Sequence, residues 1–361
     1  MTKLVFGLVG AGRIGKMHLK NVAEIQRIVA PQGIELEVVV ADAVPEFAHA
    51  AGRELGLRSV DSLEELLGIG LDGLFITTST STHPGIIRAG LEAGVPMFCE
   101  KPVTGNVPDS IEILRDIEAA GGVVQIGHQR RFDVGYIEAK RRFQSGELGW
   151  LHCLKAVSGD PFPPPVSYCA TSGGLFRDVS VHDFDIIRWL TGQEIVEVFA
   201  RGSNKGDPDI GAVGDVDTSL ALLTLSDGTL ASVAATRYNG AGYDARLDVL
   251  GSRDSVVAGL DEHSALTSAE PGVDFPSGTS YPTFAERFFE SYKKEWLSFI
   301  DLVQGKIDNP CTPFDAVAAA LVADAAQLSL ATGEAIAVPS LREVLDGSAE
   351  PLPVQELVVR V

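Results

Sequence analysis

The chain has 361 residues, 45% of them hydrophobic, so it exceeds one typical domain and can furnish two cores. Its 49 acidic and 29 basic residues give a net charge of −20, which argues against nucleic-acid or anionic-membrane partners. The four cysteines are scattered without metal-type spacing, as is typical of reduced cytosolic thiols. The N-terminus lacks the features of a signal peptide, and no stretch approaches the ~20 apolar residues of a membrane span, so we expect a cytoplasmic protein.

The first 42 residues predict a strand, a glycine turn, a helix and a second strand that ends in a carboxylate. The apolar run 4–9 leads into Gly10-Ala11-Gly12-Arg13-Ile14-Gly15. In this pattern the first glycine permits the turn, the second lets the backbone approach a pyrophosphate, and the third lets the helix pack on the strand. A second apolar run, 35–41, ends at Asp42, where this fold places an acid for the adenosine ribose hydroxyls. The stretch therefore predicts a dinucleotide site, with a purely structural glycine turn as the alternative.

The alternation of strands and helices continues to residue 128. After the first two strands, the sequence predicts strands at 74–77, 96–99 and 123–127, and helices at 45–55, 61–65, 83–93 and 111–120. Strands separated by helices imply a parallel, doubly wound sheet. We therefore predict an N-terminal α/β domain of the Rossmann type over residues 1–128.

The rhythm changes after Arg130, and residues 129–361 are predicted to form a substrate-binding and oligomerisation domain. The expected helices are 134–143, 174–190, 284–304 and 314–332, and the expected strands are 150–157, 195–201, 218–225, 229–236, 245–250 and 255–259. Short turns such as Ser226-Asp227-Gly228 join neighbouring strands as hairpins. This pattern predicts an α+β fold with a largely antiparallel sheet. Strands 220–225 and 230–235 are apolar at both alternating phases, so we expect the outer sheet face to be buried in a homo-oligomer, with a solvated face as the alternative.

Two sequence motifs carry the chemistry. Glu100-Lys101-Pro102 follows a strand at the carboxyl edge of the parallel sheet, where ligands bind in open α/β folds. Because Pro102 favours extended backbone geometry at Lys101, the lysine side chain is presented at this edge rather than folded into a helix. The alternative is an ordinary surface lysine before a turn. In the helix 174–190, Asp178, His182 and Asp185 fall on one narrow stripe at ~100° per residue. A carboxylate and an imidazole one turn apart suit a general base, against the alternative of a structural histidine.

Weaker candidates surround these motifs. Thr78, Ser79 and His83 belong to a hydroxyl-rich segment that either lines the cofactor or, for His83, caps a helix. Arg131 lies at the domain junction, where it either binds a substrate oxygen or forms a salt bridge. Tyr243 either reaches the substrate or covers the core. No group of histidine, cysteine and acidic residues has the spacing of metal ligands, so we expect no metal.

Together these motifs resemble those of the glucose–fructose oxidoreductase, inositol dehydrogenase and MocA family. The resemblance covers Gly10–Gly15 with Asp42, Glu100-Lys101-Pro102, 127–133, and Gly173-Gly174 through Asp178 and His182. It extends to 242–244 and 286–288. Residues 129–133 and 160–165 are most similar to the inositol-oxidising members.

The resemblance implies roles for individual residues. His182 would take the proton of the oxidised hydroxyl with Asp178 supporting it, and Lys101 would hydrogen-bond the substrate and help to organise proton transfer. The implied NAD ligands are Gly10, Gly12, Arg13, Ile14, Gly15, Asp42, Thr78, Ser79, His83, Glu100, Lys101 and Gln129. The implied substrate ligands are Lys101, Arg131, Asp178, His182 and Tyr243.

The expected activity is the NAD-dependent oxidation of a secondary alcohol of a cyclic polyol, with myo-inositol as the expected substrate and a homotetramer as the expected assembly. Another cyclitol such as scyllo-inositol, or an aldose such as glucose, is the alternative substrate. A non-catalytic dinucleotide-binding sensor is the alternative of a different class. Such a sensor has no need of Lys101, Asp178 and His182 together.

Overall fold

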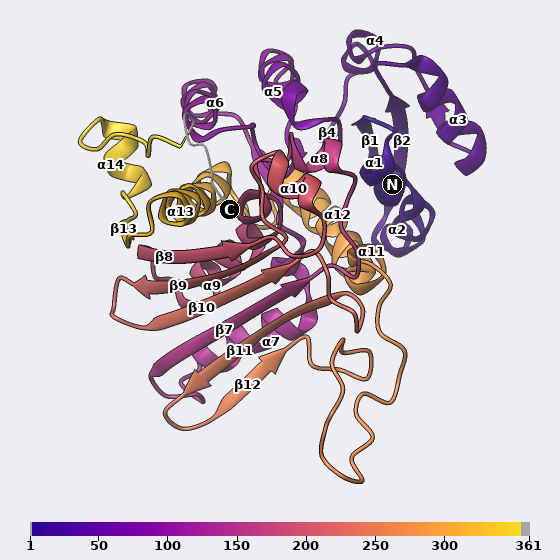
Figure 1. Ribbon diagram of the computed structural model, residues 1–361. Helices are drawn as coiled ribbons and strands as arrows, with labels where there is room; N and C mark the ends of the chain where they lie inside the picture. The colour runs from indigo at the N-terminus through magenta and orange to yellow at the C-terminus, as the bar shows by residue number, and fades with distance from the viewer. Residues whose placement is uncertain (1, 355–361) are drawn as a thin grey trace. The chain divides into compact units, whose positions relative to one another are not determined.

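The computed structural model describes residues 2–354, and their packing forms two compact units (Figure 1). Unit 1 contains residues 2–129 and 290–317, and unit 2 contains residues 130–289 and 318–354. The packing thus groups residues 290–317 with the N-terminal part of the chain. The domain division predicted from the sequence, 1–128 and 129–361, stays a prediction.

Unit 1 is built on a six-stranded parallel sheet with the order β3-β2-β1-β4-β5-β6. The strands are β1 Thr2–Val9, β2 Ile34–Ala41, β3 Arg58–Ser59, β4 Gly73–Ile76, β5 Met97–Glu100 and β6 Val124–Gly127. The strand order reverses between β1 and β4, and open α/β sheets bind ligands beyond the carboxyl ends of the strands at such a point. The predicted doubly wound sheet is confirmed.

Helices alternate with these strands as expected. They are α1 Arg13–Lys20, α2 Val22–Val29, α3 Pro45–Leu55, α4 Leu63–Leu67, α5 His83–Glu92, α6 Val107–Ala120 and α12 Phe289–Val303, with short 3₁₀ turns η1 Ala30–Gln32 and η2 Thr80–Thr82. The start of α4 shows how local sequence sets a boundary. The Ser62 hydroxyl accepts the Glu65 N–H at 3.1 Å, while the Glu65 carboxylate accepts the Asp61 N–H at 3.1 Å.

Helix α12 completes the core of unit 1, although more than 150 residues separate it from β6. The Trp296 ring stacks on Phe75 with 3.6 Å between centroids, and Phe299 packs edge-on against Phe75 at 5.2 Å. Phe6 of β1 joins this fully buried cluster. The single helix predicted over 284–304 is divided at Phe288 into α11 Phe284–Arg287 and α12.

Unit 2 contains a seven-stranded sheet with the order β12-β11-β7-β10-β9-β8-β13. The strands are β7 Leu151–Gly159, β8 Ile195–Ser203, β9 Thr218–Leu225, β10 Leu230–Thr236, β11 Asp244–Gly251, β12 Ser255–Ala258 and β13 Ile336–Ala337. All neighbours pair antiparallel except β7 and β10, which pair in parallel. The predicted α+β fold with a largely antiparallel sheet is confirmed.

The remaining helices belong mainly to unit 2. They are α7 Val134–Gln144, α8 Val166–Cys169, α9 Val181–Thr191, α10 Pro208–Ala212, α11, α13 Pro313–Thr332 and α14 Leu341–Asp346, with the 3₁₀ turn η3 Gln129–Phe132. The predicted continuous helix over 174–190 is wrong in its first turn, because Phe176–Ser180 (η4) is a π-helical turn that leads into α9. Such turns are frequent at functional sites.

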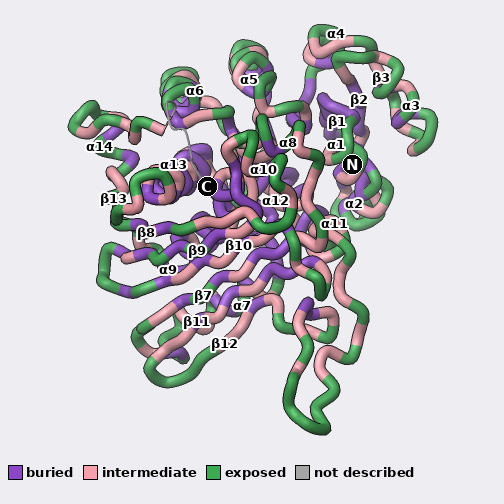
Figure 2. Tube along the Cα trace, viewed as in Figure 1, coloured by how far each residue is buried: buried purple, intermediate pink, exposed green. Residues whose placement is uncertain are grey.

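The two faces of the unit 2 sheet differ in exposure. In β9, Ala221, Leu223 and Leu225 are buried, whereas the alternate positions Leu220 and Leu222 are 62% and 61% exposed. Figure 2 shows that buried and less buried stretches alternate along the strands of this sheet. Helix α9 packs against β7, and Ser329 of α13 accepts the backbone N–H of Ala200 in β8 at 2.8 Å. One face is therefore covered by helices, and the other presents leucines to solvent.

The expectation that no stretch approaches the length of a membrane span is wrong for helix α13. It alone among the described helices is long and apolar enough to cross a membrane by length and composition. Since 61% of its most apolar window is buried inside the protein, as in the core helix of a soluble domain, this is weak evidence for a span.

Candidate active site

The glycine turn after β1 has the geometry of a phosphate cradle. Gly10 has φ +102°, and a Cβ there would lie 2.7 Å from the backbone of Thr77 and Thr78. A Cβ on Gly15 would lie 1.8 Å from the Gly10 carbonyl oxygen, whereas one on Gly12 would meet no atom within 4 Å. No side chain caps the N-terminus of α1 among the described residues, so its N–H groups suit an anion. This turn fits the pyrophosphate of a dinucleotide.

Asp42, directly after β2, stabilises the glycine turn through a hydrogen bond. Its Oδ2 accepts the Ala11 N–H at 2.7 Å, and its Oδ1 accepts the Val44 N–H at 2.9 Å. Each carboxylate oxygen can accept a second hydrogen bond, which suits ribose hydroxyls. The residue therefore both fixes the turn and carries a negative charge beside it.

The loop after β4 is tied to the neighbouring loop by His83. The Thr77 hydroxyl donates to the Gly10 carbonyl at 2.8 Å, which joins β4 to the glycine turn. The buried His83 ring places Nδ1 2.9 Å from the Pro102 carbonyl oxygen and Nε2 3.2 Å from that of Thr78. Burial lowers the pKa of His83. The alternative that His83 caps a helix is wrong, because its ring contacts the backbone carbonyl groups of two neighbouring loops instead.

The carboxyl edge of the unit 1 sheet gathers most of the predicted cofactor residues. Glu100 ends β5 and is followed by Lys101, and Gln129 follows β6. Together with the loops after β1, β2 and β4, these residues occupy one edge of the sheet. The edge thus has the form expected of a dinucleotide site.

In unit 2, two side chains hold Asp178 in the π-helical turn. The Tyr168 hydroxyl donates to its Oδ1 at 2.9 Å, and Arg237 Nη1 donates to its Oδ2 at 3.1 Å. Arg237 is fully buried, and its Nη2 donates to Asp215 at 3.0 Å. Asp215 in turn accepts the Leu175 N–H at 2.9 Å, which fixes the start of the turn. Asp178 is therefore firmly oriented.

His182 lies in the first turn of α9, four residues after Asp178, and is half-buried. Its neighbour Asp183 is fully buried and pairs with Arg130, and the Ser158 hydroxyl donates to it at 2.7 Å. Asp183 is thus part of the core of unit 2. In the first turn of α9, His182 is therefore the residue whose side chain can act as a general base.

Two other predicted residues have structural partners. The Arg131 guanidinium binds Asp185 with two hydrogen bonds, at 2.9 and 2.6 Å, and both side chains are buried. Asp185, placed by the sequence on the stripe of Asp178 and His182, is therefore engaged by Arg131. Tyr243 is 9% exposed, with its ring near Phe288. The predicted substrate contacts of Arg131 and Tyr243 stay predictions.

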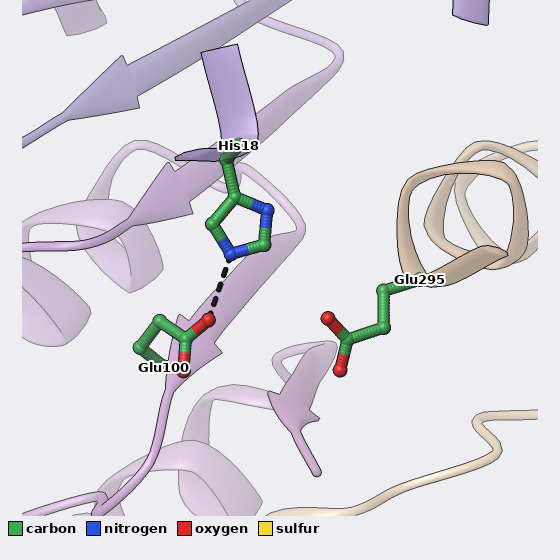
Figure 3. A group of neighbouring side chains, drawn as sticks. All are labelled: His18, Glu100 and Glu295. Carbon is green, nitrogen blue, oxygen red and sulfur yellow. Dashed lines mark hydrogen bonds and ion pairs between the residues drawn. The ribbon is translucent and has the colours of Figure 1, made fainter. Parts of the chain in front are cut away.

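Tyr168, Asp215 and Arg237 were not among the site residues predicted from the sequence. A signal for Arg237 exists, because a charged residue directly follows β10, a strand whose alternate residues are buried. A group of three possible metal donors was not predicted either. It consists of His18, Glu100 and Glu295, whose ligand atoms lie within 4.8 Å of one another (Figure 3). Their positions are too far apart in the sequence to form a spacing motif.

Comparison with known proteins identifies the family. Residues 4–128 match the model described as "Oxidoreductase family, NAD-binding Rossmann fold", and residues 136–257 match the GFO/IDH/MocA C-terminal domain. The chain belongs to the GFO/IDH/MocA oxidoreductase family. The glycine turn and Asp42 are thus parts of its NAD-binding Rossmann domain.

Similar proteins of this family match almost the whole chain. An uncharacterized oxidoreductase, YrbE of Bacillus subtilis, is 34% identical over 95% of this chain and 99% of its own length. Myo-inositol 2-dehydrogenase of Thermotoga maritima is 32% identical over 90% of this chain and 95% of its own. A crystal structure of scyllo-inositol dehydrogenase from Lactobacillus casei, with bound NAD(H) and scyllo-inositol, superposes with a TM-score of 0.81 at 28% identity, covering 93% of this chain and 99% of that one.

Proposed function

We propose that this oxidoreductase converts one secondary alcohol of a cyclic polyol to a ketone with NAD as the hydride acceptor, and that its substrate is myo-inositol. The observation that carries this proposal is the fixed Asp178 one turn before His182, in a chain that also has the NAD cradle and Lys101. Relatives named myo-inositol and scyllo-inositol dehydrogenases support the substrate class.

In the proposed mechanism His182 accepts the proton of the substrate hydroxyl. Asp178, held by Tyr168 and Arg237, stabilises the imidazolium that forms. Lys101 donates hydrogen bonds to substrate oxygens, since an ammonium group is a donor only. NAD, when bound, takes the hydride from the carbon that bears the hydroxyl. The alcohol thus loses a hydride and a proton, and the products are the ketone, NADH and protonated His182.

Asp42 favours NAD over NADP in this proposal. Its carboxylate can accept hydrogen bonds from ribose hydroxyls but repels a 2′-phosphate. Ala43 follows it, and alanine offers no positive charge to a phosphate.

We also propose that the exposed face of β9 and β10 is the contact between copies in a cytoplasmic homotetramer. Leu220, Leu222 and Leu230 are each more than half exposed on neighbouring strands. Burying leucine side chains removes apolar surface from water at roughly 25 cal/mol per Å². The net charge of −20 opposes nucleic-acid and anionic-membrane partners.

The test is NADH formation from NAD with a panel of inositol stereoisomers and common aldoses. Fastest turnover of myo-inositol supports the proposal. Much faster turnover of scyllo-inositol would be compatible with the proposed mechanism but would show that myo-inositol is not the preferred substrate. Fastest turnover of an aldose would show that the substrate is not a cyclitol.

A further inference from the structure

An acidic side chain of unit 1, Glu295, is buried beside the residue that precedes Lys101. Glu295 lies on α12 and is fully buried, and neither of its carboxylate oxygens has a hydrogen-bond partner among residues 2–354. Figure 3 shows its carboxyl group directed toward Glu100 and His18. A buried carboxyl group in this position needs a physical explanation, because burying an uncompensated polar group costs free energy.

Glu100 and His18 already form a pair. His18 Nε2 lies 2.7 Å from Glu100 Oε1, and the imidazole is fully buried. His18 belongs to α1, the helix that follows the glycine turn, and Glu100 is the last residue of β5. The pair therefore links the helix of the NAD cradle to the turn that carries Lys101.

The surroundings of the pair are aromatic. The rings of Phe98 and Tyr292 lie 5.5 Å from the His18 ring between centroids, and that of Trp296 lies 6.5 Å away. In such an apolar shell a second carboxylate beside Glu100 is strongly disfavoured. Burial, reinforced by the charge of Glu100, raises the pKa of Glu295 well above its ordinary value.

We propose that Glu295 is a neutral carboxylic acid that directs its O–H toward the Glu100 carboxylate through one bridging water, because the two groups lie within 4.8 Å of each other without a direct hydrogen bond. In this way it acts as a positioning residue for Lys101. The inference rests on the catalytic role proposed for Lys101. Glu100 is then a single negative charge held from two sides, by His18 of α1 and by Glu295 of α12. This arrangement restricts the Glu100 side chain and steadies the turn that follows it, as a supporting shell of hydrogen bonds does for a reactive group.

The inference is tested with two substitutions at one position. Glu295→Gln keeps the size and the ability to donate a hydrogen bond, through its amide NH2, and Glu295→Leu removes every donor. Since a hydrogen bond to a charged group is stronger than one between neutral groups, we expect kcat of Glu295→Leu to fall about 10- to 100-fold, and that of Glu295→Gln to stay within about threefold. NADH affinity and the thermal midpoint of Glu295→Gln should match those of the wild type. Glu290→Gln, on an exposed residue of the same helix, is the matched control.

Infrared difference spectra between the wild type and Glu295→Gln test protonation directly. We expect the carbonyl band of a protonated carboxyl group in the wild type and its loss in Glu295→Gln. Absence of that band, wild-type kcat in Glu295→Leu, or one tightly bound divalent cation per chain in the purified protein would overturn the inference. Full activity of Lys101→Ala would also overturn the inference, because it rests on the role of Lys101. Absence of NADH formation with every cyclitol would instead overturn the proposed function while leaving the infrared band of Glu295 in place, so the two failures are distinguishable.

Discussion

Arg237 donates a hydrogen bond from its fully buried guanidinium to the Asp178 carboxylate over 3.1 Å. The same guanidinium binds Asp215, which accepts the backbone N–H groups of Leu175 and Val216 at 2.9 and 2.8 Å. The orientation of Asp178 is therefore built into the fold of unit 2. This relationship fixes the carboxylate that precedes the proposed general base, His182, by four residues in the chain.

The contact of Tyr168 with Asp178 allows a mild test of this arrangement. Tyr168→Phe removes one hydrogen bond, which contributes about 0.5–1.5 kcal/mol, so we expect kcat/KM to fall about 2- to 10-fold. Because Tyr168 is 42% exposed, the thermal midpoint should not change.

Arg237→Gln is the harsher change, since it leaves the carboxylates of Asp178 and Asp215 without their cation. We expect the free energy of unfolding in urea to fall by about 3–5 kcal/mol. A stable and fully active Arg237→Gln variant would contradict the role of Arg237 in holding Asp178 and Asp215.

His182→Ala tests the general base. We expect turnover to fall about 10²–10⁴-fold, because the proton of the hydroxyl loses its acceptor. NADH affinity, measured by fluorescence titration, should stay unchanged, because the NAD cradle lies in unit 1. Loss of NADH binding together with activity would show that the assigned role is wrong.

Cofactor preference tests Asp42. At a separation of about 4 Å, two like charges repel by on the order of 4 kcal/mol at an effective dielectric constant of about 20, so NAD should be preferred by more than tenfold in kcat/KM. Asp42→Asn keeps the shape and removes the charge, and we expect it to reduce the preference. Comparable efficiency with NAD and NADP in the wild type would refute this prediction.

Asp324 predicts a pH dependence of stability. It is buried on α13 and pairs with Arg177, and burial raises its pKa from 3.8 to about 6 despite the opposing effect of Arg177. The folded state then binds a proton more tightly than the unfolded state, so the contribution of Asp324 is fully present below about pH 4 and is lost as the pH rises to about 6. The difference amounts to about 3 kcal/mol.

Urea unfolding of the wild type and Asp324→Asn at both ends of this pH range measures that contribution. We expect the wild type to lose stability relative to Asp324→Asn as the pH rises. Asp308→Asn, at an exposed carboxylate, serves as the control, and a pH-independent difference for Asp324→Asn would contradict the prediction.

The exposed leucines of the unit 2 sheet predict an oligomer. Light scattering of the wild type should give a multiple of the 38.2 kDa chain mass, and the double variant Leu220→Asp, Leu222→Asp should give a smaller mass. Leu260→Asp, at another exposed leucine, is the matched control. A wild-type mass near that of one chain at micromolar concentration would contradict the predicted assembly.

The parts of the fold that could be predicted from the sequence are local. The glycine turn and the helix from Pro45 to Leu55 depend on neighbouring residues, and the structure has both of them. The break at Phe288 and the π-helical turn around Asp178 were missed, because a regular 3.6-residue period cannot reveal a local change of pitch.

Contacts between distant positions account for the rest. Arg237 meets Asp178 across 59 residues, and the parallel pairing of β7 with β10 joins strands separated by β8 and β9. Glu295 reaches Glu100 only because α12 packs on the sheet of unit 1. Its one sequence signal is an acidic residue among the buried aromatic residues of α12, which marks an unusual position without naming its partner.

The most direct test of the proposed function is NADH formation by wild-type protein and His182→Ala with NAD and the inositol stereoisomers. We predict that the wild type turns over myo-inositol fastest and that His182→Ala loses about 10²–10⁴-fold of this rate while NADH affinity is retained. Absence of NADH formation with every cyclitol, or undiminished turnover by His182→Ala, would contradict the proposed function.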